Sequence, residues 1–348
     1  MDNAGAPIRY RTARELLKDH QTADKIKPEL LGNPVVQLWL QNLKPDMPPQ
    51  HWSMEHGSFD FNLENALLKV VQLGLHAGFP QIKDAVQYYL GKIQAPPGKP
   101  VRNRSNQAGH IFTCNLLACA GFTDGAALDF LLESTDELYG FARKGSYDIY
   151  CNAEERAALK GIPAVYRDRP IIKSSIADVY GYCYPLVYDI IGLHKLFELN
   201  NPEIDSKIDC IIEYISTNEF HNTVADGYGV LPPFERKYHT MGWDPKYPGW
   251  YDVTDYTENI NPRKLLFFAL YISKYPLARK TKWFGELLGY LDTYKTAECR
   301  HQFPPEWFKE NQGYAVQGSH LSFGENRRKK NWREIESTFY TQLIRQYI

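Results

Sequence analysis

Several features that define common protein classes are missing from this chain of 348 residues. No stretch approaches the roughly 18 consecutive apolar residues that a membrane-spanning helix needs. The opening residues, MDNAGAPIRYRTARELL, also lack the apolar segment of a secretory signal peptide. We therefore expect a soluble cytoplasmic protein without a transmembrane segment.

Neither sign of charge dominates, because 40 Lys and Arg residues face 41 Asp and Glu residues, for a formal net charge of -1. Such a chain has no general attraction to nucleic acids or anionic membranes. Its one basic run, residues 327–330, is short. We expect a small-molecule substrate as the partner, and no nucleic acid.

Cysteine is scarce, with six residues scattered between positions 114 and 299 and no CxxC pair. In a cytoplasmic protein this distribution predicts free thiols. No Gly-rich phosphate loop, nucleophile elbow or HExxH motif occurs in the sequence. The commonest nucleotide-binding, hydrolase and metalloprotease signatures are thereby excluded.

Aromatic residues, by contrast, are abundant. The chain holds 24 Tyr, 17 Phe and 7 Trp, which together make up 14% of its residues. This exceeds what an ordinary helical core needs, and it predicts that many of the rings line a cavity or a binding surface.

One short phrase, a glycine closely followed by an aromatic residue, recurs along the chain. It appears as HGSFDF at 56–61, KGSYDIY at 144–150, DGYGVL at 226–231 and QGYAVQ at 312–317. Successive glycines of these phrases lie 82 to 88 residues apart. A nearly constant spacing is typical of repeat architectures.

The segments between these turns have the apolar spacing of paired helices. The expected pairs are 63–78 with 80–93, 107–122 with 124–144, 179–200 with 202–215, and 262–275 with 281–296. Two further helices, 33–44 and 331–348, are placed to form the pair that closes a ring. We predict an all-α fold: an N-terminal extension over 1–30, then a single α/α toroid of five to six helical hairpins over 31–348. An open solenoid is the alternative.

The alternation of hairpin and Gly-aromatic turn resembles a known superfamily. Segments such as HGSFDFNLENALLKVVQLGL and YPLVYDIIGLHKLFELNNPEID are similar to the α/α toroids of squalene-hopene cyclases and protein prenyltransferase β-subunits. The resemblance covers about residues 30–348 and implies two concentric rings of helices around a central cavity. The DxDD string with which such cyclases protonate their substrate does not occur in this chain.

In such a toroid the residues that open the inner helices converge on one mouth of the cavity. Acid/base chemistry needs carboxylates, a histidine or tyrosines there, because burial moves their pKa values toward the working range. The candidate catalytic residues are Asp60, Glu64, His110, Asp178, Tyr184, Asp189 and Glu336. The alternative for each is an ordinary helix-end residue or surface ion pair.

A second candidate region is the long connection over 221–261, for which no clear helix is expected. Its tryptophans and tyrosines alternate with hydrogen-bonding groups, which is the composition of a lid or binding platform. The candidate substrate-binding residues here and on the inner helices are Tyr180, Tyr188, His239, Trp243, Trp250 and Arg263. A loop packed on its own aromatic side chains is the alternative.

No cofactor is predicted, although a zinc site is a weaker hypothesis. His110 and Cys114 lie four residues apart on one helix, and Cys299 and His301 form a second pair. Four such ligands satisfy zinc. Neither pair has a recognised metal-site spacing, and buried cysteines commonly act as small hydrophobic residues.

These observations favour a cyclase, isomerase or lyase that encloses a small molecule in an aromatic-lined cavity and acts by acid/base chemistry. Two alternatives stay open. One is a carbohydrate-active lyase or hydrolase on a helical barrel, with tryptophans stacked on sugar. The other is a non-catalytic toroid that serves as a binding protein or scaffold.

Overall fold

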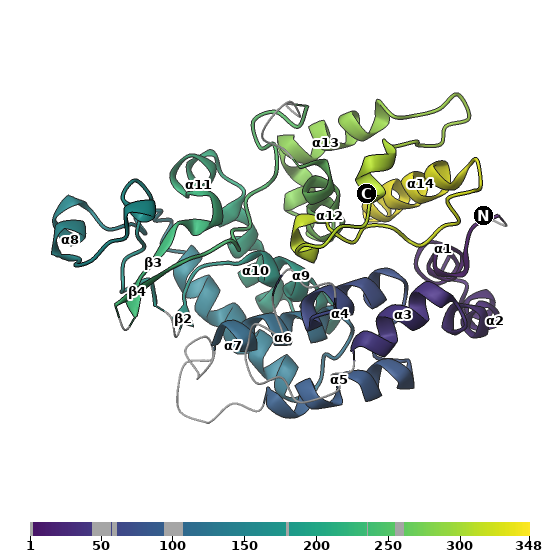
Figure 1. The fold of residues 1–348 in the computed structure, drawn as a ribbon, viewed down its shortest axis with the longest axis horizontal. Helices are drawn as coiled ribbons and strands as arrows, with labels where there is room; N and C mark the ends of the chain where they lie inside the picture. The colour runs from purple at the N-terminus through teal and green to yellow at the C-terminus, as the bar shows by residue number, and fades with distance from the viewer. Residues whose placement is uncertain are drawn as a thin grey trace. The chain divides into compact units, whose positions relative to one another are not determined.

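The structure, a computed structural model, describes residues 3–43, 57, 61–93, 107–178, 181–234, 236–254 and 261–348. Most of these residues lie in helices (Figure 1), which confirms the prediction that the chain is mainly α-helical. None of the helices in the described ranges combines the length and the apolar character needed to cross a bilayer. Closure of the helices into a toroid stays a prediction.

The chain divides into two compact units. The terminal unit comprises Met1–Gly91, Cys119–Phe122 and Pro248–Ile348, and the central unit comprises Lys92–Ala118 and Thr123–Tyr247.

Helices from both ends of the chain build the terminal unit. They are α1 (Ala6–Arg11), α2 (His20–Leu31), α3 (Pro34–Leu43), α4 (Leu63–Gln72), α5 (Pro80–Lys92), α12 (Pro262–Ile272), α13 (Lys282–Asp292) and α14 (Trp332–Arg345). A π-helical turn, Thr12–Leu16, and 3-10 turns at Ala278–Lys280, Pro305–Phe308 and Ala315–Gln317 complete it.

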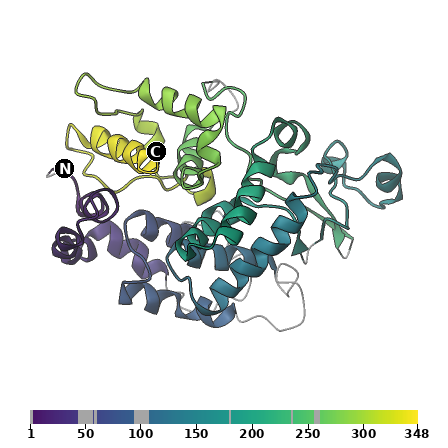
Figure 2. The same cartoon turned by 180° about the vertical axis from the view of Figure 1, so that it is seen from behind.

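The segment predicted as an N-terminal extension is helical and packed. Ile8 and Tyr10 of α1 are buried, and α1 lies beside α2, as Figure 2 also shows. The side chain of Asp19 caps α2 by accepting a 3.0 Å hydrogen bond from the N–H of Thr22. A carboxylate at this position satisfies a backbone donor that has no partner within the helix. These residues therefore contribute to the core of the terminal unit.

The core of this unit centres on α4, a helix buried on nearly every side. Leu67 and Val70 are fully buried, and so is most of the Lys69 side chain. Helix α4 packs against α3 and the 315–317 turn, while α12 packs against α14 and the same turn. Residues 315–317 thus lie against helices from both halves of the sequence.

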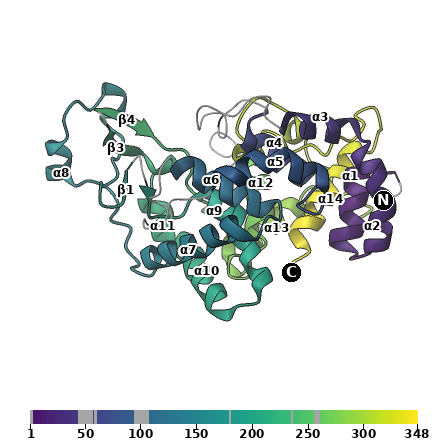
Figure 3. The ribbon, with the colours of Figure 1, turned by 90° about the horizontal axis from the view of Figure 1, so that it is seen from below.

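Shorter elements make up the central unit. Its helices are α6 (Gln107–Cys119, whose last residue belongs to the terminal unit), α7 (Gly125–Ala142), α8 (Ala153–Ala158), α9 (Val187–Gly192), α10 (Pro202–Ile215) and α11 (Asn218–Thr223). Two antiparallel hairpins pair β1 (Ala177–Asp178) with β2 (Gly181–Tyr182), and β3 (Val230–Phe234) with β4 (Lys237–Thr240). Helix α7 packs along α10, and Figure 3 shows the two side by side.

The helix expected over 179–200 is wrong at its start. Gly181 and Tyr182 form a strand, α9 begins only at Val187, and residues 193–199 form a 3-10 helix. Pro185 accounts for part of the difference, because proline disfavours helical geometry at the residue before it. Asn200, in the left-handed conformation with φ of 51°, ends the 3-10 segment before α10 begins.

The connection over 221–261 also holds more regular structure than expected. It includes the end of α11 and the whole hairpin β3–β4. Pro232 and Pro233 sit within β3, where proline is tolerated because the strand lies at an edge of its two-stranded sheet. The Gly-aromatic phrase before it forms a true turn: Gly227 has a φ of 67°, and a Cβ there would lie 2.4 Å from the carbonyl oxygen of Met241.

Candidate functional site

The residues predicted to form a site are divided between the two units. Asp60 and Tyr180 lie outside the described residues, as does the side chain of Asp178. The terminal unit contains Glu64, Trp250, Arg263, Cys299, His301 and Glu336, and the central unit contains His110, Cys114, Tyr184, Tyr188, Asp189, His239 and Trp243. Glu64 is buried on α4, Arg263 donates from the first turn of α12 to the carbonyl of Lys309, and His239 is exposed on β4.

In the central unit, Asp189 has the contacts of a structural cap. Its side chain is fully buried and accepts a 2.7 Å hydrogen bond from the N–H of Leu186, at the start of α9. Its other oxygen accepts a 3.1 Å bond from the amide of Asn115 on α6. Gly192 allows this arrangement, because a Cβ there would lie 2.1 Å from the amide oxygen of Asn115. Asp189 thereby ties α9 to α6.

The predicted aromatic residues of the central unit pack on one another. The ring of Tyr184 lies 4.3 Å from that of Tyr228, and the ring of Tyr188 lies 4.3 Å from that of Phe112. Phe112 also contacts Trp243, with ring centroids 4.7 Å apart and nearly perpendicular planes. Such edge-to-face contacts stabilise a core. Much of the aromatic content of this unit is therefore used in packing.

The four zinc candidates also fall in different units. Burial raises the pKa of the Cys114 thiol, which disfavours the thiolate that a metal requires. In the terminal unit Cys299 is exposed, whereas His301 is buried with its Nε2 atom 3.0 Å from a carboxylate oxygen of Asp292. Among the described residues, no three His, Cys, Asp or Glu side chains are grouped to hold a metal ion.

Glu336 of α14 fixes a loop of the terminal unit. One carboxylate oxygen accepts 3.1 Å hydrogen bonds from the backbone N–H groups of Phe323 and Glu325 and from the hydroxyl of Ser322. The other oxygen lies 3.3 Å from the guanidinium of Arg327. Burial raises the pKa of Glu336 to about 7, although the charge of Arg327 opposes that rise.

Two pockets formed by described residues of the terminal unit offer candidate sites. The larger, with a volume of about 210 Å³, lies between α1 and α14. Its apolar lining includes Ile8 and Phe339, and its charged lining residues, Arg300 and Glu334, form an ion pair with each other at 3.3 Å. The charges of this pocket therefore cancel.

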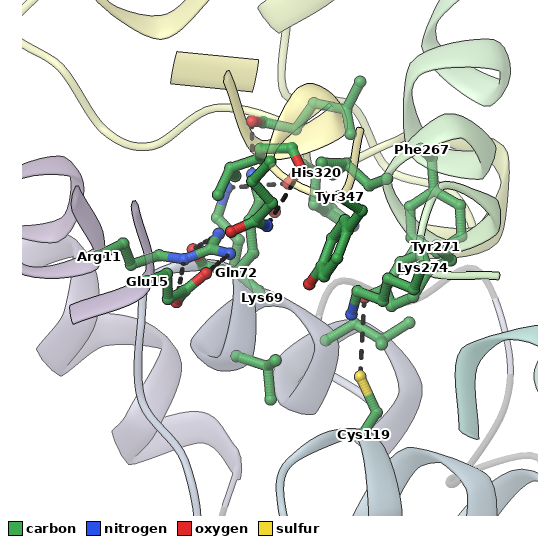
Figure 4. A pocket seen from close by; sticks show the side chains of 17 residues that line it. Arg11, Glu15, Lys69, Gln72, Cys119, Phe267, Tyr271, Lys274, His320 and Tyr347 are labelled. Atoms are coloured by element: carbon green, nitrogen blue, oxygen red, sulfur yellow. Dashed lines mark hydrogen bonds and ion pairs between the residues drawn. The ribbon is translucent and has the colours of Figure 1, made fainter. Parts of the chain in front are cut away.

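The smaller pocket, with a volume of about 80 Å³, is lined by a denser set of chemical groups (Figure 4). Its polar lining comes from many parts of the sequence, from near the start to near the end: Arg11, Glu15, Lys69, Gln72, Cys119, Tyr271, Lys274, His320, Gln346 and Tyr347. Leu68, Phe267, Leu270 and Leu343 belong to its apolar lining. None of the predicted site residues that the structure describes is among those lining this pocket.

On one side of the pocket, Arg11 and Glu15 form a two-pronged ion pair, with distances of 2.8 Å and 2.7 Å. A third N–H of Arg11 donates to the carbonyl of Gln72 on α4, at 2.8 Å. Burial raises the pKa of Glu15, but the nearby guanidinium of Arg11 outweighs it and leaves the pKa below its ordinary value. This carboxylate is therefore ionised at neutral pH.

Next to this pair, Lys69 and Glu310 fix the position of His320. The ammonium of Lys69 donates to Glu310 at 2.9 Å, to the carbonyl of His320 at 3.0 Å, and to the carbonyl of Ser322. Glu310 in turn contacts the Nδ1 atom of His320 at 3.3 Å and accepts from the N–H of Ser322 at 2.9 Å. Burial raises the pKa of Glu310, yet Lys69 and His320 bring it down to about 2.

The opposite side of the pocket belongs to α12 and the residues that follow it. The ammonium of Lys274 lies 4.9 Å from the centre of the Tyr271 ring, and the thiol of Cys119 lies 3.9 Å from the Tyr271 hydroxyl. Figure 4 shows Tyr271, Lys274 and Cys119 across the pocket from Arg11 and Glu15. The charge of Lys274 contributes to the lowered pKa of Glu15, so its field reaches across this site.

Sequence reasoning missed this pocket because its parts come from the start, the middle and the end of the chain and meet through long-range contacts. One local signal was present. Lys69 lies in the apolar stretch LENALLKVVQLGL, and a lysine on a buried helix needs acceptors supplied from elsewhere in the chain.

No family model, no curated protein and no solved structure matches this chain. The chemistry of the pocket is therefore the basis for assigning a function to this chain.

Proposed function

We propose that the terminal unit binds a small organic anion in the 80 Å³ pocket and that His320 acts on this ligand as a general acid or base. The observation that carries the proposal is the lining itself. Three cationic side chains, Arg11, Lys69 and Lys274, and one oriented imidazole border the same pocket as several apolar side chains. Small-molecule sites commonly combine an apolar surface with a few convergent polar groups.

The three cations lie in different parts of the pocket lining. Arg11 is offset by Glu15, and Lys69 is offset by Glu310. Lys274 stands at the other wall, beside the ring of Tyr271. A carboxylate or phosphate that enters the pocket gains a charge-assisted hydrogen bond from Lys274, and such bonds are stronger than neutral ones.

The contact between Glu310 and His320 supports acid/base chemistry. When the Nδ1 atom of His320 donates its proton to Glu310, the lone pair of the imidazole lies on Nε2. A carboxylate on one ring nitrogen orients the ring and stabilises the imidazolium that forms when the other nitrogen takes up a proton. The expected reaction is a proton transfer within a small anionic substrate, as in isomerases and lyases.

The first experiment tests anion binding. Titration calorimetry on the purified chain, with small carboxylates and phosphate at constant ionic strength, should give heats of binding for at least one anion. Lys274→Met should weaken that binding by about tenfold or more, because it removes a charge-assisted partner. The matched control is Lys282→Met on α13, whose side chain is 88% exposed. Equal affinities for the two variants would contradict the proposal.

The second experiment separates catalysis from binding. His320→Gln keeps a polar side chain at the position but cannot exchange a proton near neutral pH. We expect this variant to bind the anion and to lose turnover of any substrate found among the ligands. Full turnover with Gln at position 320 would assign the chemistry to another group.

We also propose that the helices follow the α/α toroid that the sequence resemblance implies. Helices that pack in pairs support this proposal. In the terminal unit α3 packs beside α4 and α12 beside α14, and in the central unit α7 packs beside α10. A crystal structure would test it, and an open arrangement of the helices would contradict it.

A further inference from the structure

The larger pocket of the terminal unit, with a volume of about 210 Å³, is separate from the proposed anion site. Among the described residues, none lines both pockets. Helix α14, together with its cap residue Asn331, supplies the lining residues Asn331, Glu334, Ile335, Thr338, Phe339 and Gln342. Residues three and four positions apart lie on one face of a helix. One continuous face of α14 therefore forms a wall of this pocket.

The opposite wall belongs to residues 3–8, which are held in place by hydrogen bonds to the rest of the unit. The carbonyl of Asn3 accepts from the ammonium of Lys329 at 2.9 Å. The N–H of Gly5 donates to the carboxylate of Glu325. Glycine permits this close approach, because a Cβ at position 5 would lie 2.9 Å from Oε1 of Glu325. Both walls are thus formed by the protein alone, as is usual for small-molecule sites.

The charged residues that line this pocket compensate each other. The described lining includes one cation, Arg300, and one anion, Glu334, whose closest atoms lie 3.3 Å apart. A ligand with a single charge meets the like-charged member of this pair as well as the opposite one, and it also gives up part of its hydration. The pocket therefore favours a ligand without net charge.

The volume and the rest of the lining limit the shape of the ligand. A cavity of about 150 Å³ holds benzene, so this pocket has room for such a ring with a small substituent. A rigid ring also loses less entropy on binding than a flexible chain of the same size. Ala4, Ile8 and Phe339 supply buried apolar surface. Asn331 and the exposed Gln342 supply carboxamides, which both donate and accept hydrogen bonds.

We infer that this pocket binds a small uncharged molecule that joins one benzene-sized ring to a hydrogen-bonding group such as a carboxamide. Its ring packs on Ile8 and Phe339, and its polar group bonds the carboxamide of Asn331 or Gln342. The inference is independent of the proposed anion site, because it uses none of the residues that line the smaller pocket.

Benzamide, benzoate, benzylammonium and acetamide form a panel that tests the inference by titration calorimetry near neutral pH and at constant ionic strength. Benzoate and benzylammonium keep the ring but add a charge, and acetamide keeps the amide but lacks the ring. We expect benzamide to bind at least about tenfold more tightly in this pocket than each of the other three. Equal or tighter binding of any of them there would overturn the inference, and so would an absence of benzamide binding.

A variant that fills the pocket shows which binding takes place in it. Ile335→Phe on α14 adds a ring to the lining and should weaken benzamide binding by about tenfold or more. Leu288→Phe on α13, a half-buried position that lines neither pocket, is the matched control and should leave the affinity unchanged. Benzoate binding counts against the inference only where Ile335→Phe weakens it, because an anion held in the smaller pocket does not touch this residue.

Circular dichroism and thermal unfolding show whether the Ile335→Phe protein is folded. If it is not, Gln342→Trp takes its place, because position 342 is an exposed part of the same lining and tolerates a large side chain. An unchanged affinity for benzamide in the folded variant would overturn the inference.

Discussion

Asp189 in the central unit and Lys69 in the terminal unit, both buried, differ in where their hydrogen-bond partners lie in the sequence. In the central unit, Asp189 bonds the N–H of Leu186, three residues away, and the amide of Asn115, and aromatic rings surround the region. In the terminal unit, Lys69 bonds Glu310, 241 residues away, and carbonyls beyond it, and these contacts border a pocket. A buried polar side chain that bonds the backbone at the start of its own helix indicates a helix cap. A buried charge that bonds residues far away in the sequence, beside a cavity, indicates a candidate site.

The largest expected effect comes from removing Lys69. Lys69→Ala leaves Glu310 and two backbone carbonyls without their ammonium partner and empties part of the core. We expect the free energy of unfolding, measured by urea denaturation, to fall by about 4 kcal/mol. The control in the central unit is Lys207→Ala, which breaks exposed ion pairs with Asp136 and Glu203. If both variants lost the same free energy of unfolding, the buried contacts of Lys69 would not be more stabilising than exposed ion pairs of the central unit.

The next effect is a pH dependence that originates at Glu336. Its pKa is raised to about 7 from an ordinary value of 4.5, so the folded protein holds the proton more tightly than the unfolded chain between these values. The stability contributed by this proton is present below pH 4.5 and is lost as the pH rises to 7. The expected loss is at most about 3 kcal/mol.

Glu336→Gln should flatten the stability profile over this pH window, as measured by urea denaturation at successive pH values. Glu334→Gln, on the same helix α14 but paired with Arg300 near the surface, is the control and should keep the slope. A slope that survives Glu336→Gln would show that another group titrates.

A smaller effect is expected at Asp189. In Asp189→Asn one side-chain oxygen can still accept from the N–H of Leu186, but the new amide then faces the amide of Asn115. We expect a loss of about 1 to 2 kcal/mol in the free energy of unfolding. The affinity of the terminal unit for an anion that binds at the proposed site should not change, and calorimetry checks this. A large loss of anion affinity in this variant would support the prediction that Asp189 belongs to a functional site.

The smallest effect on stability is expected at Lys274. This residue is half-buried and follows α12, and Lys274→Met keeps most of its apolar stem. The free energy of unfolding should change by no more than about 0.5 kcal/mol, although anion binding should fall. A strongly destabilised Lys274→Met protein would indicate that Lys274, like Lys69, contributes mainly to the stability of the fold.

Elements with strong local signals could be predicted from the sequence. Helix α10 begins at Pro202 and ends at Ile215, as expected, and α12 begins at the expected Pro262. In both, an asparagine caps the start and proline occupies the first helical position, which are signals contained within a few residues.

The parts that could not be predicted depend on contacts between distant residues. Whether a proline ends a helix or lies in an edge strand, as Pro232 does, depends on a neighbouring strand rather than on the local pattern. The pocket is an extreme case, because Arg11 and Tyr347 both line it. Glu336 was among the predicted candidates, and its carboxylate bonds a loop through the backbone of Phe323 and Glu325, an arrangement that no local pattern indicates.

The bonds of Lys69 also have a consequence for how the protein folds. They join α4 to Glu310, His320 and Ser322, so the ammonium closes loops of 241 to 253 residues. Contacts of such high sequence separation form late, because a long loop must be closed before they bring any stabilisation. During synthesis the helices of the central unit can therefore assemble while the pocket proposed to bind an anion is still incomplete, and this pocket is among the last parts of the chain to mature.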